Sequence, residues 1–278
     1  MSEIPVRPLA GSSHGSGRKL GRVEWARLLV VENGVRWTAY AGLLGGLRKA
    51  SSLVSERMTR LERGKGLSGR TGRAVNYEYW QRWDWSSRGE EWTLSEDWKR
   101  ALIDDVMRRH MKPATTILEI GPGAGRWTEA LQTIAGRLIV VDLSDRCIEL
   151  CRRRFAGASN IEYHVNDGRS LDALAANSVD GVWSFDVFVH IAAPDIDAYV
   201  KEIGRVLRPG GRAVIHHAGA GGARDAADVG MRSNMTSGQF AAMVQKHGLT
   251  LAEQFDSWGP DGRFQVPWKW DIVSVFDK

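Results

Sequence analysis

Three histidines and one aspartate occupy positions suited to proton transfer. His190 follows an apolar, strand-like run, and His216 and His217 end another. Imidazole has an unperturbed pKa of about 6.5, so it can take a proton from a hydroxyl group near neutral pH. Asp186, four residues before His190, is placed to orient such a histidine. We expect at least one of the three histidines to act as a general base.

The two adjacent histidines cannot share one role. Side chains alternate between the two faces of a strand, so His216 and His217 point to opposite sides. One of them can therefore face the mouth of a site while the other packs against a helix. For any one histidine taken alone, packing inside the fold is the simpler interpretation.

Glycines recur at alternate positions in the segment Glu119-Ile-Gly121-Pro-Gly123-Ala-Gly125. They allow a tight turn and let a ligand approach the backbone without interference from a Cβ atom. A dinucleotide-binding loop, G-x-G-x-x-G, would require a further glycine where Arg126 stands. That glycine permits close helix packing beside a pyrophosphate. The loop therefore predicts a nucleotide-like ligand that lacks a pyrophosphate.

Two further strand ends carry acids. Asp142, with Leu143 beside it, ends an apolar run, and its carboxylate is placed to accept hydrogen bonds from both hydroxyls of a ribose. Asn166-Asp167-Gly168 ends the next run, where an acid and an adjacent backbone amide can bind the edge of an adenine. Ligands of open α/β sheets lie outside the carboxyl ends of the strands, so these groups are expected at one site.

Short apolar, β-rich runs alternate with helical segments after residue 115. We expect strands at 116–120, 138–143, 161–165, 179–185 and 212–216, and helices at 125–134, 145–155, 171–175 and 196–207. Such alternation predicts a parallel sheet with helices on both faces. Two more runs, at 249–255 and 271–276, are expected to form a closing hairpin.

Capping boxes predict the starts of two further helices. One is Thr93-Leu-Ser-Glu96, and the other is Thr236-Ser-Gly-Gln239, whose helix ends at Gly248. The first helix is expected to bury an apolar face that includes Trp98.

The combination of E-x-G-x-G-x-G, strand-end Asp142, Asp167-Gly168 and Leu207-Arg-Pro-Gly-Gly211 resembles the class I S-adenosylmethionine (SAM)-dependent methyltransferases. The resemblance implies an α/β, Rossmann-like, doubly wound seven-stranded sheet whose last strand is antiparallel. It implies SAM as cofactor and S-adenosylhomocysteine as product, with Glu119 holding the methionine end, Asp142 the ribose, and Asp167 with Gly168 the adenine. The expected cofactor-binding residues are Glu119, Gly121, Gly123, Gly125, Asp142, Leu143, Asn166, Asp167, Gly168 and Phe185, although Phe185 is equally suited to the core.

The methyl acceptor is less clearly indicated. Five of the twelve tryptophans lie between Trp80 and Trp98, and in this family the corresponding region commonly forms a lid. Together with the His-His strand end, these tryptophans are similar to those of bacterial methyltransferases of polysaccharide and secondary-metabolite pathways. Exposed tryptophan faces suit sugars, flat apolar ligands or a cation. We therefore expect O-methylation of a small-molecule or glycan hydroxyl.

Two other functions stay open. The chain can methylate a nucleic acid or a protein docked on a basic extension, although Ser184-Phe-Asp-Val replaces the Asn/Asp-Pro-Pro-Tyr/Phe signature of amino-methyltransferases. It can also be a non-catalytic SAM-binding module. The carboxylate set of metal-dependent catechol-type relatives is replaced by His-His, so we expect no catalytic metal, although Asp186, His190 and His217 are together able to bind one.

Charge divides the chain. Residues 1–75 hold 14 Lys and Arg against 5 Asp and Glu, whereas the whole chain has a net charge of +5. Such a segment is able to touch an anionic membrane, a nucleic acid or an acidic partner, and a solvated tail is the simpler interpretation. Helices are expected at 25–31 and 43–61, and 11–17 is expected to be flexible. We divide the chain into a basic extension (1–75), a tryptophan-rich lid with the first helix (76–112) and a SAM-binding domain (113–278).

The remaining composition is that of an ordinary globular protein. It is 43% hydrophobic, with no uninterrupted apolar run of the roughly 18 residues that a membrane span needs and no secretory signal at the N-terminus. Cys147 and Cys151 share one helix face, where a disulfide is improbable, so both are expected to be small core residues. These features predict a cytoplasmic protein, and they leave its oligomeric state open.

Overall fold

The computed structural model describes residues 21–65, 67–219 and 232–278. The expected flexible segment at 11–17 lies outside the described residues. The chain divides into two compact units, residues 1–54 and 55–278.

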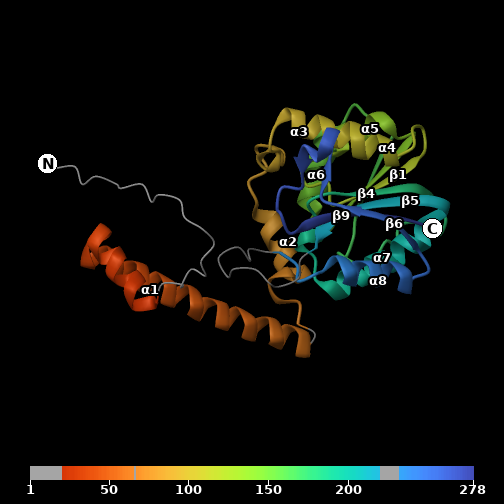
Figure 1. Cartoon of the computed structure of the whole chain (residues 1–278). Helices are drawn as coiled ribbons and strands as arrows, with labels where there is room; N and C mark the ends of the chain where they lie inside the picture. Colours follow the sequence, from red (N-terminus) through yellow and green to blue (C-terminus); the bar gives the residue numbers. More distant parts are fainter. Residues whose placement is uncertain (1–20, 66, 220–231) are drawn as a thin grey trace. The chain divides into compact units, whose positions relative to one another are not determined.

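A single helix, α1 (Arg22–Lys65), occupies the described part of the first unit and continues to residue 65 (Figure 1). Two shorter helices were expected here, and the structure joins them. Gly34 interrupts the regular helix with a φ of 79°, a left-handed value that glycine adopts readily, so α1 is kinked at this residue. No helix in the described residues combines the length and the apolar character needed to cross a bilayer.

The second unit is built on a seven-stranded sheet in the order β3-β2-β1-β4-β5-β9-β6 (Figure 1). The pairs within β3-β2-β1-β4-β5 are parallel, and β9 runs antiparallel to both β5 and β6. This confirms the expected doubly wound sheet with an antiparallel last strand. The strands are β1 (Thr116–Ile120), β2 (Arg137–Asp142), β3 (Ile161–Val165), β4 (Val179–Ser184), β5 (Leu207–Ala218), β6 (Thr250–Phe255) and β9 (Asp271–Asp277), and β7 (Ser257–Trp258) pairs with β8 (Phe264–Gln265) in a separate ribbon.

Helices cover both faces of the sheet (Figure 1). One face packs against α7 and α8, and the other packs against α3 to α6. Buried Ile and Val side chains of the central strands alternate between the two faces, as a sheet covered on both sides requires. The helical elements are η1 (Gly69–Thr71), α2 (Arg73–Arg82), η2 (Glu90–Trp92), α3 (Glu96–Ala101), η3 (Leu102–Met107), α4 (Arg108–His110), α5 (Thr128–Ile134), α6 (Asp145–Arg154), η4 (Phe188–His190), α7 (Ala193–Val206), α8 (Ser237–Lys246) and η5 (Pro260–Gly262).

The strand order reverses between β1 and β4, which lie side by side and in parallel. The chain leaves β1 towards β2 on one side and leaves β4 towards β5 on the other, so the segments after these two strands separate. Ligands of open α/β sheets bind in the crevice formed at such a point. The glycine loop follows β1, and the segment that contains Asp186 and His190 follows β4.

Two local expectations were wrong. The segment 171–175 is not helical, and the carbonyls of Leu171 and Leu174 accept hydrogen bonds from the Arg205 guanidinium at 2.9 Å and 2.8 Å. The first capping box is also displaced, because Ser95, not Thr93, caps α3 through a bond from the Trp98 amide. The box at Thr236 is confirmed.

Candidate active site

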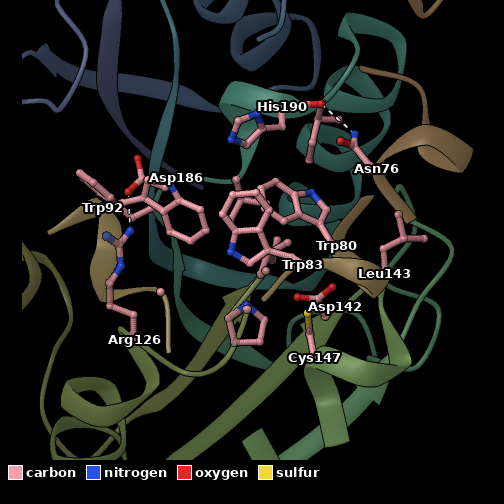
Figure 2. Close-up of a pocket in the computed structure, with 18 of the residues that line it drawn as sticks. Asn76, Trp80, Trp83, Trp92, Arg126, Asp142, Leu143, Cys147, Asp186 and His190 are labelled. Carbon is pink, nitrogen blue, oxygen red and sulfur yellow. Dashed lines mark hydrogen bonds and ion pairs between the residues drawn. The ribbon is translucent and has the colours of Figure 1, made fainter. Parts of the chain in front are cut away.

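A cavity of about 460 Å³ opens in the crevice between β1 and β4. Figure 2 shows Asp142 and Cys147 on one side of it and His190 on the other, with Trp80 and Trp83 between them. Most of the walls come from the glycine loop, the ends of β2, β3 and β4, the segment from α2 through the tryptophans, and a short stretch before β9. Besides the residues just named, the lining includes Arg73, Asn76, Trp85, Trp92, Gly121, Gly123, Arg126, Trp127, Leu143, Gly168, Phe185, Asp186, Arg232 and Trp268.

The glycine loop forms the floor. Gly121 and Gly123 line the cavity with φ angles of 73° and 57°, in the left-handed region where side chains are disfavoured. A Cβ atom on Gly123 would lie 2.8 Å from the ring of Trp85, which packs directly over the loop. Gly125 also has a positive φ, but a Cβ there would meet Phe155 instead, and Gly125 does not line the cavity.

Asp142 lines the cavity at the end of β2. Its Oδ1 accepts a hydrogen bond of 2.8 Å from the Ser144 amide. Burial raises the pKa of this carboxyl to about 6, against the lowering effect of its backbone hydrogen bonds. Leu143 and Cys147 lie beside it in the lining, and both cysteines are buried free thiols, as expected.

Glu119 lies beneath the loop and not in the cavity. It is 1% exposed, and its Oε2 accepts a hydrogen bond of 2.6 Å from the Thr128 hydroxyl. Burial raises the pKa of Glu119 to about 8. A contact of this side chain with a ligand would therefore have to run through the loop backbone.

The segment after β3 is held largely by its own hydrogen bonds. Asn166 donates to the Tyr199 hydroxyl at 2.8 Å and accepts from the Gly168 amide at 3.1 Å. The Asp167 carboxylate accepts from two following amides and lies 3.6 Å from Arg73 Nη1. Among these three residues, Gly168 lines the cavity and the side chains of Asn166 and Asp167 do not.

Arg73 was not anticipated from the sequence. It begins α2, lines the cavity and forms ion pairs with Asp167 and with Asp195 (3.4 Å). The three charges come from positions as far apart as 73 and 195, so no local pattern could have grouped them.

Four tryptophans form a wall opposite the loop. Trp80, Trp83, Trp85 and Trp92 have ring centroids 5.4 to 6.1 Å apart where they contact one another. All four are half-buried and line the cavity. Hydrogen bonds from Gln81 to Asp145 and from Arg146 to the Gln81 carbonyl fasten α2 to the start of α6. Trp98, in contrast, is 2% exposed and belongs to the core.

His190 reaches the cavity, whereas the other two candidate histidines do not. Its ring contacts Trp80 edge-on, with centroids 5.3 Å apart. The half-buried ring is presented by η4, and Asn76 binds the carbonyl of the same residue at 2.8 Å. His190 therefore lies between the tryptophan wall and the end of β4.

His216 and His217 are both fully buried and point to opposite faces of β5, as strand alternation requires. His217 stacks on Phe240 of α8 at 3.8 Å between centroids, and its Nε2 lies 2.7 Å from the Ser274 hydroxyl. Burial lowers its pKa to about 3. His216 lies below the cavity, stacked on Phe185 at 4.2 Å. Both side chains are buried in the core, away from the cavity. The alternation of side chains along a strand predicts their directions but not this burial.

Asp186 links His216 to the cavity through Arg126. Its backbone amide donates to His216 Nδ1 at 3.1 Å, and its carboxylate forms an ion pair with the Arg126 guanidinium. Burial alone would raise the pKa of Asp186, but Arg126 and His216 outweigh it and hold the pKa well below its usual range. The φ of Asp186 is 62°, so these contacts hold the residue in a disfavoured conformation.

The Arg126 guanidinium has spare bonding capacity. The residue is 4% exposed and lines the cavity, yet its Nη1 has no hydrogen-bond partner among the residues that the structure describes. A buried cationic donor without a partner is costly, and an anionic group of a ligand would satisfy it. In the sequence, Arg126 was noted because it stands where a dinucleotide-binding loop has its last glycine. It was not predicted to bind a ligand.

Residues 117–211 match the model of a family described as a methyltransferase domain, and they contain the glycine loop, Asp142 and Gly168. The chain contains a class I SAM-dependent methyltransferase domain. The TehB-like SAM-dependent methyltransferase from Corynebacterium glutamicum has the same fold, with a TM-score of 0.53 and 23% identity over 74% of this chain and 100% of that chain.

Relatives known from sequence agree on the domain and differ in their acceptors. The ubiquinone biosynthesis O-methyltransferase of Xanthomonas campestris is 26% identical over 110 residues, which are 39% of this chain and 45% of that protein. The ribosomal RNA small subunit methyltransferase A of Pseudomonas fluorescens is 40% identical over 72 residues, which are 26% and 27% of the two chains. This chain spans less than half the length of the curated relatives it matches.

The cavity of this methyltransferase domain fits SAM. Left-handed glycines leave room for a ligand against the loop, and Asp142 offers a carboxylate. Arg126 offers a donor without a partner at the far end of the loop. Within the part of the chain that the structure describes, no three His, Cys, Asp or Glu side chains gather as a metal site.

Proposed function

We propose that this chain methylates a hydroxyl group of a small-molecule or glycan acceptor, with His190 as the general base. SAM, when bound, supplies a methyl group on a positively charged sulfur. The supporting observation is that one cavity brings together the glycine loop, Asp142, the tryptophan wall and His190 (Figure 2).

The chain's own contribution is chiefly alignment. Methyl transfer is an in-line displacement, so its rate depends on holding the acceptor oxygen in line with the donor. The tryptophan wall offers flat apolar faces on which a sugar or an aromatic ring can lie. It also limits the access of water to the cavity. A lid role for residues 76–112 follows from the same wall and is part of this proposal.

His190 is the candidate that can take the proton of the acceptor hydroxyl. It lines the cavity on the side opposite Asp142, whereas His216 and His217 are enclosed by the core (Figure 2). Asp186 then serves to hold Arg126 and His216, since its carboxylate pairs with Arg126 and its backbone amide donates to His216 Nδ1.

At the donor end, Arg126 is proposed to bind the methionine carboxylate of SAM. Asp142 is proposed to bind the ribose, and Leu143 with Gly168 the adenine. In Figure 2, Arg126 lies at the left of the cavity and Asp142 with Leu143 lies towards its right.

Methyl transfer from deuterium-labelled SAM tests the proposal. The chain would be incubated with phenols, sugars, nucleosides, peptides and RNA, and labelled products would be located by mass spectrometry. A labelled methyl ether on a phenol or sugar supports the proposal. Labelling confined to nitrogen atoms, to RNA or to protein would contradict it, and binding of S-adenosylhomocysteine with no labelled product in any class would favour the non-catalytic module.

A further inference from the structure

One face of α1 is apolar and exposed between residues 40 and 61. At about 100° of rotation per residue, seven large apolar side chains fall within an arc of about 100°. We call this set the apolar face; it consists of Tyr40, Leu43, Leu44, Leu47, Val54, Met58 and Leu61. Their side chains are between 43% and 72% exposed. Ser51 is the one polar residue of this stretch that shares the arc.

Basic residues border the apolar face. Arg48 and Arg57 lie about 90° to either side of its centre, at its two edges. Lys49 and Arg60 lie on the far side of the helix, as does Glu56, which is the one acidic residue of the stretch. An exposed apolar stripe with an arginine along each edge is therefore built into a helix that carries an excess of positive charge.

We propose that the apolar face of α1 binds the surface of an anionic lipid membrane, with the helix axis parallel to that surface. Apolar side chains of such a helix enter the boundary between headgroups and acyl chains. Arg48 and Arg57 stand where their alkyl stems can stay in this boundary while their guanidinium groups reach lipid phosphates. The remaining positive charge adds attraction to an anionic leaflet.

Charge argues against the other occupants of this face. A second copy of α1 would bring an equal excess of positive charge against the first, and Glu56 lies too far around the helix to pair with either edge arginine. A nucleic acid would attract the arginines but would leave seven apolar side chains in water. An anionic lipid surface would attract the positive charge of the helix and would also remove the seven apolar side chains from water.

Flotation of the full chain with phospholipid vesicles tests the proposal. Binding is expected to phosphatidylcholine vesicles that contain phosphatidylglycerol, and much less to phosphatidylcholine alone. Leu47→Ser is expected to lower the partition coefficient about tenfold, because a buried leucine side chain is lost from the interface. Leu53→Ser is the matched control: Leu53 is 54% exposed but lies well outside the arc, so binding should change less than twofold.

Paired arginine variants test the edges. Arg48→Gln with Arg57→Gln and Lys49→Gln with Arg60→Gln remove the same charge, but only the first pair borders the apolar face. The first pair is expected to weaken binding to the phosphatidylglycerol vesicles by about fivefold per arginine, and the second pair by clearly less. Equal losses from the two pairs would show general charge attraction and overturn the proposal.

Three other results would also overturn it. These are no flotation of the wild-type chain, equal losses from Leu47→Ser and Leu53→Ser, or a dimer in light scattering that Leu47→Ser dissociates, which would make the face an interface between copies. Helical content by circular dichroism and unchanged affinity for S-adenosylhomocysteine establish that each variant is folded. Flotation and these two controls require no methyl acceptor. The membrane proposal can therefore fail while the methyl-transfer proposal stands, and the reverse.

Discussion

The side-chain amide of Asn76 donates a hydrogen bond of 2.8 Å to the backbone carbonyl of His190. The same amide lies 3.2 Å from the carbonyl of Thr71, and Asn76 is 6% exposed. The contact joins α2, which carries part of the tryptophan wall, to η4, which presents the proposed base. A single buried side chain thus connects the aromatic lid to the end of β4.

Replacing Asn76 should weaken the fold and the site together. Asn76→Leu leaves the carbonyls of Thr71 and His190 without their donor, so the free energy of unfolding should fall by about 1–3 kcal/mol, and turnover should fall because η4 loses its support. Urea unfolding and steady-state kinetics measure the two effects. Asn33→Leu, the same change at an exposed helical position, should stay within about 0.5 kcal/mol of wild type. Equal stability of the two variants would show that the Asn76 contact contributes little.

Cofactor affinity should depend on pH through Asp142. Burial raises its pKa to about 6, and the ionised carboxylate is the better acceptor for ribose hydroxyls. The affinity for S-adenosylhomocysteine should therefore rise as the pH increases through about 6 and level off above it. Glu119, whose pKa is raised to about 8, stays protonated through this window. Calorimetry across the range should show the rise in the wild type and its absence in Asp142→Asn; the same rise in both would remove Asp142 from the role.

Two histidine variants should separate catalysis from packing. His190→Ala should lower kcat by about 10² to 10⁴, the usual contribution of a general base, with unchanged affinity for S-adenosylhomocysteine. His217→Ala should lower stability, because it removes the stacking on Phe240 and the contact with Ser274, and should leave kcat per folded molecule near wild type. Kinetics with the acceptor found in the labelling screen, together with thermal unfolding, measure these effects. Wild-type kcat in His190→Ala would rule out the proposed base.

Arg126 should discriminate between ligands by their carboxylate. Arg126→Met should weaken binding of S-adenosylhomocysteine about tenfold or more, because a hydrogen bond to a charged group is lost. Binding of methylthioadenosine, which lacks the amino-acid end, should be unchanged. Calorimetry with the two ligands gives both affinities. The affinity of Arg126→Lys for S-adenosylhomocysteine should lie between those of Arg126→Met and the wild type. An equal loss for both ligands would mean that Arg126 supports the loop and does not touch the carboxylate.

The glycine loop and the strands of the sheet were predictable because both are visible in local patterns of the sequence. Alternating apolar runs report which segments are strands, and the loop from Gly121 to Gly125 is contiguous in the chain. Asp142 was found for the same reason, since the end of a strand is visible in the pattern. The helix expected at 171–175 does not form, because five residues are too few to stabilise a helix on their own. Two carbonyls of this segment accept hydrogen bonds from the Arg205 guanidinium instead.

The ionic contacts around the cavity could not be predicted in this way. Arg73 pairs with Asp167 and Asp195, and Arg126 pairs with Asp186, across separations that depend on the finished fold. Alternation also indicated the opposite directions of His216 and His217 but not how deeply the strand carries them into the core. In each case the sequence pattern does not specify which distant residues the fold brings together or how deeply a side chain is buried.

The packing of Trp85 over Gly123 has one practical consequence. Indole emission responds to the polarity and the neighbours of the ring, and six indoles line the same cavity as Asp142. Any molecule that settles against the loop must change the surroundings of at least one of them. The chain therefore carries its own optical reporter, and the entry of a nucleoside can be followed in real time without attaching a dye.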